Sequence, residues 1–175
     1  MQQHDSEDGP KAGDQGDSVK SKPPAQYLTE ARALLRNGQK RKAYGILLQA
    51  MELNPEHPVI LSYCGWLRAV VDKKPRSGIT LCRKSFVVFK TSNPHTASVI
   101  YPVLYLNLGK AFYAAGKRKE AVENFEKGLT YDRGHFEIKK EMQRLGMRKK
   151  PIVPFLSRSN PVNKYLGILR NQRTA

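Results

Sequence analysis

Apolar and polar residues alternate at helical spacing between Pro102 and Arg133. The pattern predicts two short helices, one from about Val103 to Ala115 and one from Lys119 to Thr130. Gly116 lies between them, where the C-terminal end of a helix favours a residue that tolerates a positive φ. The stretch is therefore expected to form a tight helical hairpin.

Small residues at matched positions of the two helices, Gly109 and Ala121, would let the backbones approach closely, and large side chains would fill the space beside them. The large and small residues of the hairpin are Tyr105, Leu108, Gly109, Phe112, Ala121, Phe125 and Gly128. In their order and spacing the hairpin resembles a tetratricopeptide repeat. The resemblance implies that several such hairpins stack into a right-handed solenoid.

Two further copies of the pattern precede this one. The first begins at Pro24, and the second begins at Pro58. In the second copy the small positions, Gly65 and Gly78, are thirteen residues apart, where the other copies have twelve. About ten extra residues also separate the second copy from the third. We expect them to extend the second helix of that copy to about Lys90 and to form a bridge over residues 91–98.

The two ends of the chain differ from the repeats. Residues 1–24 contain one branched aliphatic residue, Val19, and are predicted to be a disordered leader. Residues 25–146 are the expected repeat domain, ending in a capping helix over residues 136–146 with an apolar side that includes Phe136 and Ile138. The predicted fold is all-α: a short right-handed solenoid of about three helix-turn-helix repeats with a C-terminal capping helix and an extended tail.

The tail, residues 147–175, is basic and contains prolines that exclude a continuous helix over residues 150–161. Its residues 152–156 are mostly apolar. Three interpretations stay open: the tail packs back on the repeats as a cap, it docks another protein, or it occupies the groove of its own or a neighbouring chain.

The 175-residue chain has a formal net charge of +16 at pH 7, and the leader is slightly acidic, so the excess lies in the remainder. Such a surface favours nucleic acid, anionic lipid or acidic protein segments, although excess lysine and arginine also maintain solubility. No recognised nucleic-acid-binding module is present. Phosphate contacts would use a basic patch made of Lys73, Lys74, Arg76, Arg144, Arg148, Lys149 and Lys150.

No catalytic, cofactor-binding or metal-binding arrangement is predicted. None of the four histidines lies at metal-ligand spacing from a cysteine or carboxylate. Cys64 and Cys82 fall within predicted helices, so we expect reduced thiols in a cytoplasmic protein. The sequence has no stretch of membrane-spanning length and no apolar core of a secretory signal.

The family resemblance also implies a binding surface, because the first helix of each repeat lines a concave groove. Carried over by position, the groove residues are Leu28, Arg32, Leu35, Arg36, Ser62, Trp66, Val70, Leu106, Lys110 and Tyr113. The set is apolar and aromatic with three cations and no acid. A peptide with apolar and acidic residues would fit it, and Trp66 is the candidate anchor unless it only packs between repeats.

Some family members hold a C-terminal carboxylate with lysines and asparagines of three successive repeats. Asn107 stands at one such place, but Leu28, Arg32 and Tyr63 stand at others, so this mode is not predicted. The expected function is a non-enzymatic adapter for a protein or peptide partner. The alternatives are a nucleic-acid-binding protein, ranked second, and a small secretion or assembly chaperone.

Overall fold

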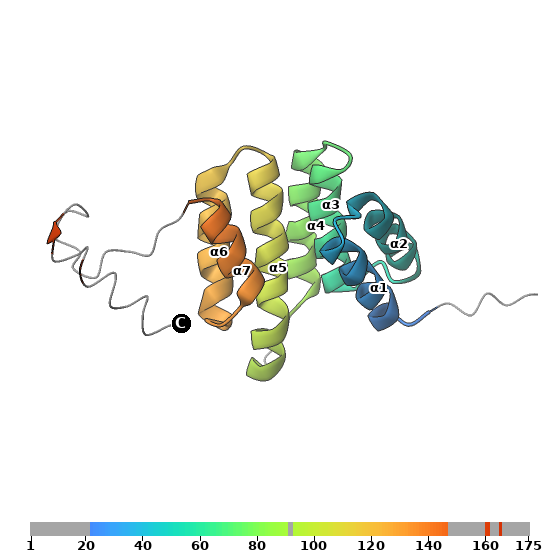
Figure 1. Ribbon diagram of the computed structural model, residues 1–175. Helices are drawn as coiled ribbons and strands as arrows, with labels where there is room; N and C mark the ends of the chain where they lie inside the picture. Colours follow the sequence, from blue (N-terminus) through green and yellow to red (C-terminus); the bar gives the residue numbers. More distant parts are fainter. Residues whose placement is uncertain (1–21, 91–92, 147–159, 162–164, 166–175) are drawn as a thin grey trace, which may run out of the picture.

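The computed structural model describes residues 22–90, 93–146, 160–161 and 165. Seven helices follow one another in residues 22–146, and no strand occurs in the described part of the chain. The helices stack side by side as shown in Figure 1. Their bounds are α1 Pro24–Arg36, α2 Lys40–Leu53, α3 Pro58–Val70, α4 Pro75–Val88, α5 Pro94–Ala114, α6 Arg118–Tyr131 and α7 Phe136–Arg144.

Proline and glycine mark many of the helix ends. Helices α1, α3, α4 and α5 each have a proline in the first turn, where no backbone N–H is needed for the helical hydrogen bonds. Gly38 and Gly116 follow α1 and α5 with φ of 74° and 75°. The turn between α3 and α4 has Lys73 at φ 57° instead, in the copy whose turn is one residue longer.

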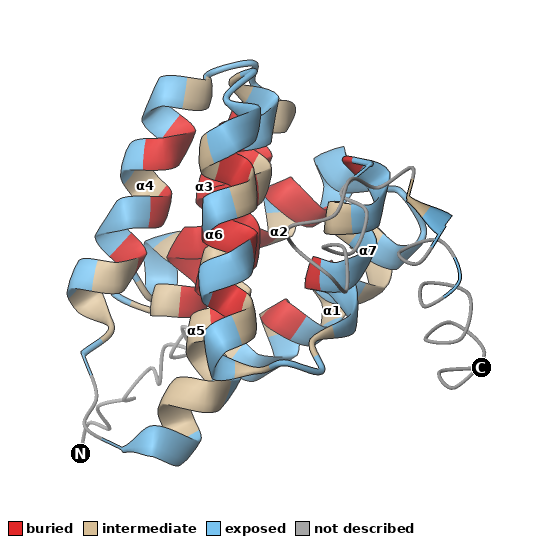
Figure 2. Ribbon diagram, turned by 90° about the vertical axis from the view of Figure 1, so that its left-hand side faces the viewer, coloured by how far each residue is buried: buried red, intermediate tan, exposed pale blue. Residues whose placement is uncertain are grey.

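Pairs of helices pack as hairpins: α1 with α2, α3 with α4, and α5 with α6. The small residues predicted at matched positions lie where the two helices of a hairpin cross. A Cβ atom at Gly109 would stand 2.4 Å from a ring carbon of Phe125, and Ala43 and Ala121 are fully buried. Figure 2 shows the buried positions on the sides of the helices that face one another. The repeat prediction is therefore confirmed.

The extra residues before the third hairpin lie elsewhere than expected. Helix α4 ends at Val88, with the same 14 residues as α2 and α6, whereas α5 has 21 residues. The predicted bridge over residues 91–98 is thus wrong from Pro94 onward. The Asn93 side chain accepts hydrogen bonds from the first amides of α5, and Pro94 favours a helix start there.

This early start places Pro102 inside α5, where a proline normally interrupts a helix. The residues before it are held by tertiary contacts instead. Tyr101 lies 4.6 Å, between ring centroids, from Tyr131 of α6 and 5.0 Å from Phe89 after α4. These ring contacts stabilise the added turns, and Pro102 itself is fully buried.

Helix α7 covers the end of the stack, as predicted for a capping helix. Ile138 is fully buried and Leu145 is nearly so, while Gly146 ends the helix at φ 66°. The expected inward position of Phe136 is wrong, because its side chain is 73% exposed. Phe136 is the first residue of α7, directly after the His135 cap, and Ile138 takes the inward position two residues later.

The leader, apart from residues 22–24, lies outside the described residues, and so does most of the tail, including residues 152–156. Among the helices that the structure describes, none is long and apolar enough to cross a membrane.

Candidate functional site

A cavity of about 290 Å³ lies between α3, α5 and α7 and reaches the first residue of α2. Its lining combines aromatic and apolar side chains with four cations and one carboxylate. The lining residues are Lys40, Trp66, Ala69, Val70, Lys73, Lys110, Tyr113, Ala114, Phe125, Glu141, Arg144 and Leu145. We call this cavity the α3–α5–α7 pocket.

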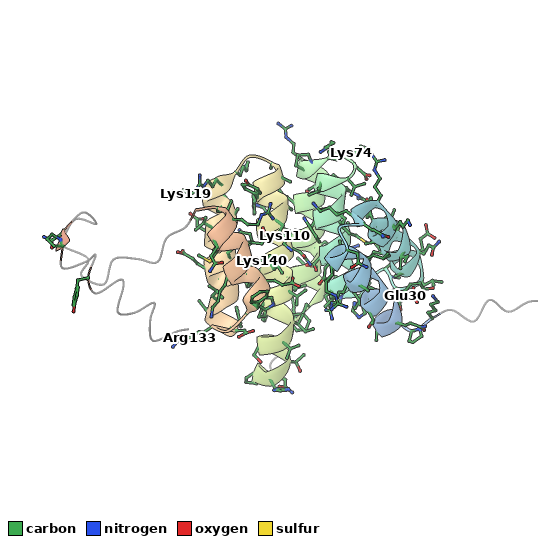
Figure 3. The ribbon with its side chains drawn as sticks, viewed as in Figure 1. Glu30, Lys74, Lys110, Lys119, Arg133 and Lys140 are labelled. Carbon is green, nitrogen blue, oxygen red and sulfur yellow. The ribbon has the colours of Figure 1, made fainter. Side chains whose placement is uncertain are left out.

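Lys110 is the central cation of the pocket. It projects from α5 on the face that α7 also occupies (Figure 3). Its ammonium nitrogen lies 4.3 Å from the centroid of the Trp66 ring, a cation–π distance. The side chain is only 14% exposed. Burial lowers the pKa of Lys110, although Glu141 and Glu137 oppose this by favouring the charged form.

Glu141 of α7 is the acid of the pocket. One carboxylate oxygen lies 3.7 Å from the Lys110 ammonium, and the other lies 2.8 Å from the Arg144 guanidinium one helical turn away. The carboxylate is therefore shared between two cations. Arg118 of α6 also donates a hydrogen bond to the carbonyl of Leu145, which secures the end of α7.

Lys40 and Lys73 complete the positive rim of the pocket. Both residues are exposed, and Lys40 adds to the charge felt by Lys110. The lining thus holds four cations and one carboxylate, and the pocket has a net positive charge. An anionic group with an apolar neighbour matches this combination of charge and aromatic surface.

The structure brings four of the predicted groove residues together in the pocket: Trp66, Val70, Lys110 and Tyr113. Tyr113 is 47% exposed and available for contact, whereas Trp66 also lines the pocket but is only 8% exposed. The family geometry therefore named four residues that share this pocket, and their role in binding a partner stays a prediction.

Three predicted groove residues are buried: Leu28, Ser62 and Leu106. Ser62 accepts a hydrogen bond of 3.0 Å from the fully buried side chain of Asn107, because α3 and α5 pack directly on each other there. These three side chains therefore lie inside the stack and do not line the pocket. The side chain of Asn107 is thus buried and bonded within the stack, a placement that the repeat pattern did not predict.

The predicted groove residues of α1 lie outside the lining of the pocket. Arg32 donates a hydrogen bond of 3.3 Å to the hydroxyl of Tyr63 and stands 5.8 Å from that ring centroid. Leu35 packs against the core, and Arg36 is exposed in the last turn of α1. Arg32 is thus held against α3, and the α1 part of the groove prediction stays a prediction.

The predicted basic patch divides into three parts. Lys73, Lys74 and Arg76 lie together around the turn between α3 and α4. Arg144 lines the same pocket as Lys73. The last three members, Arg148, Lys149 and Lys150, lie outside the described residues.

Sequence reasoning missed Lys40 and Glu141 as residues of the pocket. One signal pointed to Glu141: His135 precedes α7 as His57 precedes α3, and each imidazole accepts a hydrogen bond from the amide three residues later. Extending the repeat register through His135 would have placed α7 as the first helix of a further unit, facing the groove. No local signal pointed to Lys40.

The remaining reactive side chains are buried or dispersed. Cys64 and Cys82 are free thiols in the core, and burial raises the pKa of Cys64 to about 12 and that of Cys82 further. Thiolates are therefore strongly disfavoured in the native state. Among the described residues, no group of three or more His, Cys, Asp or Glu side chains is arranged to hold a metal ion.

Comparison with known proteins identifies the third hairpin. Residues 103–135 match a family model described as a tetratricopeptide repeat. No curated protein sequence matches the chain.

Solved structures resemble the whole stack. The first TPR domain of human RPAP3 is 20% identical, with 71% of this chain and 92% of that chain covered, and a TM-score of 0.50. The first TPR domain of Spaghetti, bound to the HSP90 peptide SRMEEVD, is 20% identical over 75% of this chain and 96% of that chain, with a TM-score of 0.50. The Arabidopsis OM64 TPR domain is 18% identical over 70% and 93%, also with a TM-score of 0.50. At these identities the likeness concerns the fold.

Proposed function

Since this chain is a tetratricopeptide-repeat protein, we propose that it is a non-enzymatic adapter that binds a peptide or protein segment over the α3–α5–α7 pocket. The observation that carries the proposal is the pocket itself, whose lining combines exposed Tyr113 and largely buried Trp66 with four cations. Its partner would carry apolar anchors beside acidic residues. The related domain of Spaghetti, bound to an acidic peptide, supports this class of ligand.

The chemistry of the pocket suits such a segment. An apolar side chain would cover Tyr113 and Val70, while a neighbouring carboxylate would approach the rim cations Lys40 and Lys73. Aromatic and charged residues provide most of the binding energy in many protein interfaces. The free, buried thiols are compatible with the reducing cytoplasm in which we place the protein.

The test is selection of peptides from a random display library, followed by affinity measurement on the selected sequences. Peptides rich in leucine or phenylalanine and in aspartate or glutamate are expected. Tyr113→Ala should weaken their binding by about tenfold, the effect of losing a contact worth about 1.4 kcal/mol. Phe136→Ala is the matched control, since Phe136 is an exposed aromatic residue, at 73%, that lies outside the pocket lining.

Two results would contradict the proposal. Selection without any enriched peptide would argue against a peptide-binding groove. Equal losses for Tyr113→Ala and Phe136→Ala would place the binding surface elsewhere. Trp66→Ala is the harsher companion variant, and its circular dichroism must match the wild-type spectrum before its affinity is interpreted, because Trp66 is largely buried.

Nucleic-acid binding is the second candidate function, and the cluster of Lys73, Lys74 and Arg76 favours it. Binding that rests on phosphate contacts weakens steeply with salt. A Lys74→Gln variant should then lose affinity for duplex DNA or RNA and show a shallower salt dependence. Affinity that is unchanged between low and high salt would exclude this function. A secretion or assembly chaperone would use the same pocket, and co-purification of one unstable client would distinguish it.

A further inference from the structure

Glu141 stands where a ligand carboxylate would be expected. It comes from α7, while the cation it meets, Lys110, comes from the centre of α5. The two residues are 31 positions apart in sequence. Both residues line the α3–α5–α7 pocket, so the capping helix places an acidic side chain inside the proposed binding site.

The pairing between Lys110 and Glu141 is incomplete. Their separation of 3.7 Å exceeds the usual length of a charge-assisted hydrogen bond, about 2.7–2.9 Å. Arg144 holds the other oxygen of the same carboxylate at 2.8 Å. Glu141 therefore interacts more closely with Arg144 than with Lys110.

Lys110 retains capacity for a second carboxylate. Its ammonium is largely withdrawn from water and lies over the Trp66 ring, which orients it but does not neutralise it. The other groups that influence it are Glu137, which favours its charge, and Arg144 and Lys40, which oppose it. A buried cation with a distant counter-ion gains from a closer acidic partner.

Building on the proposed peptide-binding function, we propose that Glu141 is an internal competitor for Lys110. An acidic side chain of the partner displaces the Glu141 carboxylate from Lys110, and Glu141 keeps its contact with Arg144. The competition sets specificity, because a neutral segment cannot replace the Glu141 carboxylate at Lys110 and gains no contact there. Lys110 is the anion-binding residue of the pocket, and Glu141 determines how acidic a partner must be.

Fluorescence anisotropy with two labelled peptides tests this proposal: one alternates leucine with glutamate, and the other alternates leucine with glutamine. Glu141→Gln keeps the size of the side chain but removes the competing charge. The affinity of this variant for the acidic peptide should be about tenfold higher than that of the wild type, equivalent to about 1.4 kcal/mol, and its affinity for the neutral peptide should be unchanged. Lys110→Met should reduce the preference for the acidic peptide to what the rim cations Lys40 and Lys73 provide, and Glu141→Gln should then have no further effect.

The matched control is Glu126→Gln, which removes an exposed carboxylate of α6 outside the pocket lining and raises the net charge equally. Trp66 is the only tryptophan of the chain, so its emission should shift when the acidic peptide contacts Lys110. This shift should be absent in Lys110→Met.

The outcomes separate the two proposals. Tightening confined to Glu141→Gln and to the acidic peptide supports the competition. Equal tightening in Glu126→Gln, or no change in Glu141→Gln while both peptides bind, would overturn it and leave the adapter function standing. If neither peptide binds the wild-type protein or any of the variants, both the competition and the adapter function are overturned.

Discussion

The crossing of α3 and α4 provides the sharpest test of how this chain builds its hairpins. Two glycines face each other there, Gly65 of α3 and Gly78 of α4. A Cβ atom added at Gly78 would lie 2.4 Å from the carbonyl oxygen of Gly65 and 2.9 Å from the Cβ atom of Ala69. The first of these neighbours is backbone, and Val59 to Leu67 of α3 are buried throughout, so α3 has little room to move away.

We therefore expect Gly78→Ala to destabilise the fold. Adding a methyl group to a filled core destabilises a protein by about 1–3 kcal/mol. Because the added Cβ would meet backbone, which cannot rotate away, we expect a cost of about 3 kcal/mol at this site. Replacing a helical glycine with alanine returns about 1 kcal/mol through the backbone entropy of the unfolded chain. The net loss of unfolding free energy should be about 2 kcal/mol.

Gly45→Ala is the matched control, because Gly45 is also helical but exposed, and a Cβ atom added there would meet nothing within 4 Å beyond the neighbouring backbone of its own helix. This variant should gain about 0.5–1 kcal/mol. Urea unfolding followed by circular dichroism measures both values, provided that the m-value stays constant, since stacked repeats can unfold in parts. A Gly78→Ala protein as stable as Gly45→Ala would refute the close-approach explanation of the α3–α4 crossing.

Three further outcomes follow from the buried and capping residues. Cys64 and Cys82 should resist thiol reagents at pH 8 in the folded protein, because burial raises the pKa of both thiols. Both should react fully in guanidinium. Rapid reaction of the native protein would contradict their burial. His57 caps α3 as a hydrogen-bond acceptor, and burial lowers its pKa in the folded protein. Acid therefore protonates His57 in the unfolded chain first. Its contribution to stability should be complete above about pH 6.5, the unfolded-state pKa, and be lost as pH falls through the lower folded-state pKa. Urea midpoints at pH 7.5 and 5 measure this loss, which should be smaller in His57→Asn. Ile138→Ala should remove about 2–5 kcal/mol or release α7 locally, seen as lost amide protection, whereas Phe136→Ala, at an exposed position, should change stability by less than about 0.5 kcal/mol.

The repeats were predictable because their signal is local. The third hairpin follows from Gly109, Ala121 and Phe125, since close helix packing demands a small residue opposite a large one at fixed spacing, and the structure has these contacts. The start of α5 was not predictable in this way. Pro102 indicates a helix boundary by local rules, and the ring contacts that override it come from α6 and from the residue after α4.

The candidate site shows the same division. Trp66, Val70, Lys110 and Tyr113 could be named from repeat positions alone. Their burial could not, since the repeat register specifies the side of a helix but not how closely its neighbour packs. Leu106 was therefore expected at the surface of the groove and lies in the core.

By itself, the sequence determined the helical hairpins, their small-residue crossings and the positive charge of the chain, because periodicity and composition are properties of neighbouring residues. The tertiary structure alone decided that the capping helix places Glu141 between Lys110 and Arg144, and that Lys40 and Lys73 stand around them. These residues come from separate helices, and their distances depend on how the helices stack. The pairing of a largely buried lysine with a carboxylate of the capping helix is therefore a property of the packed solenoid and not of any one repeat.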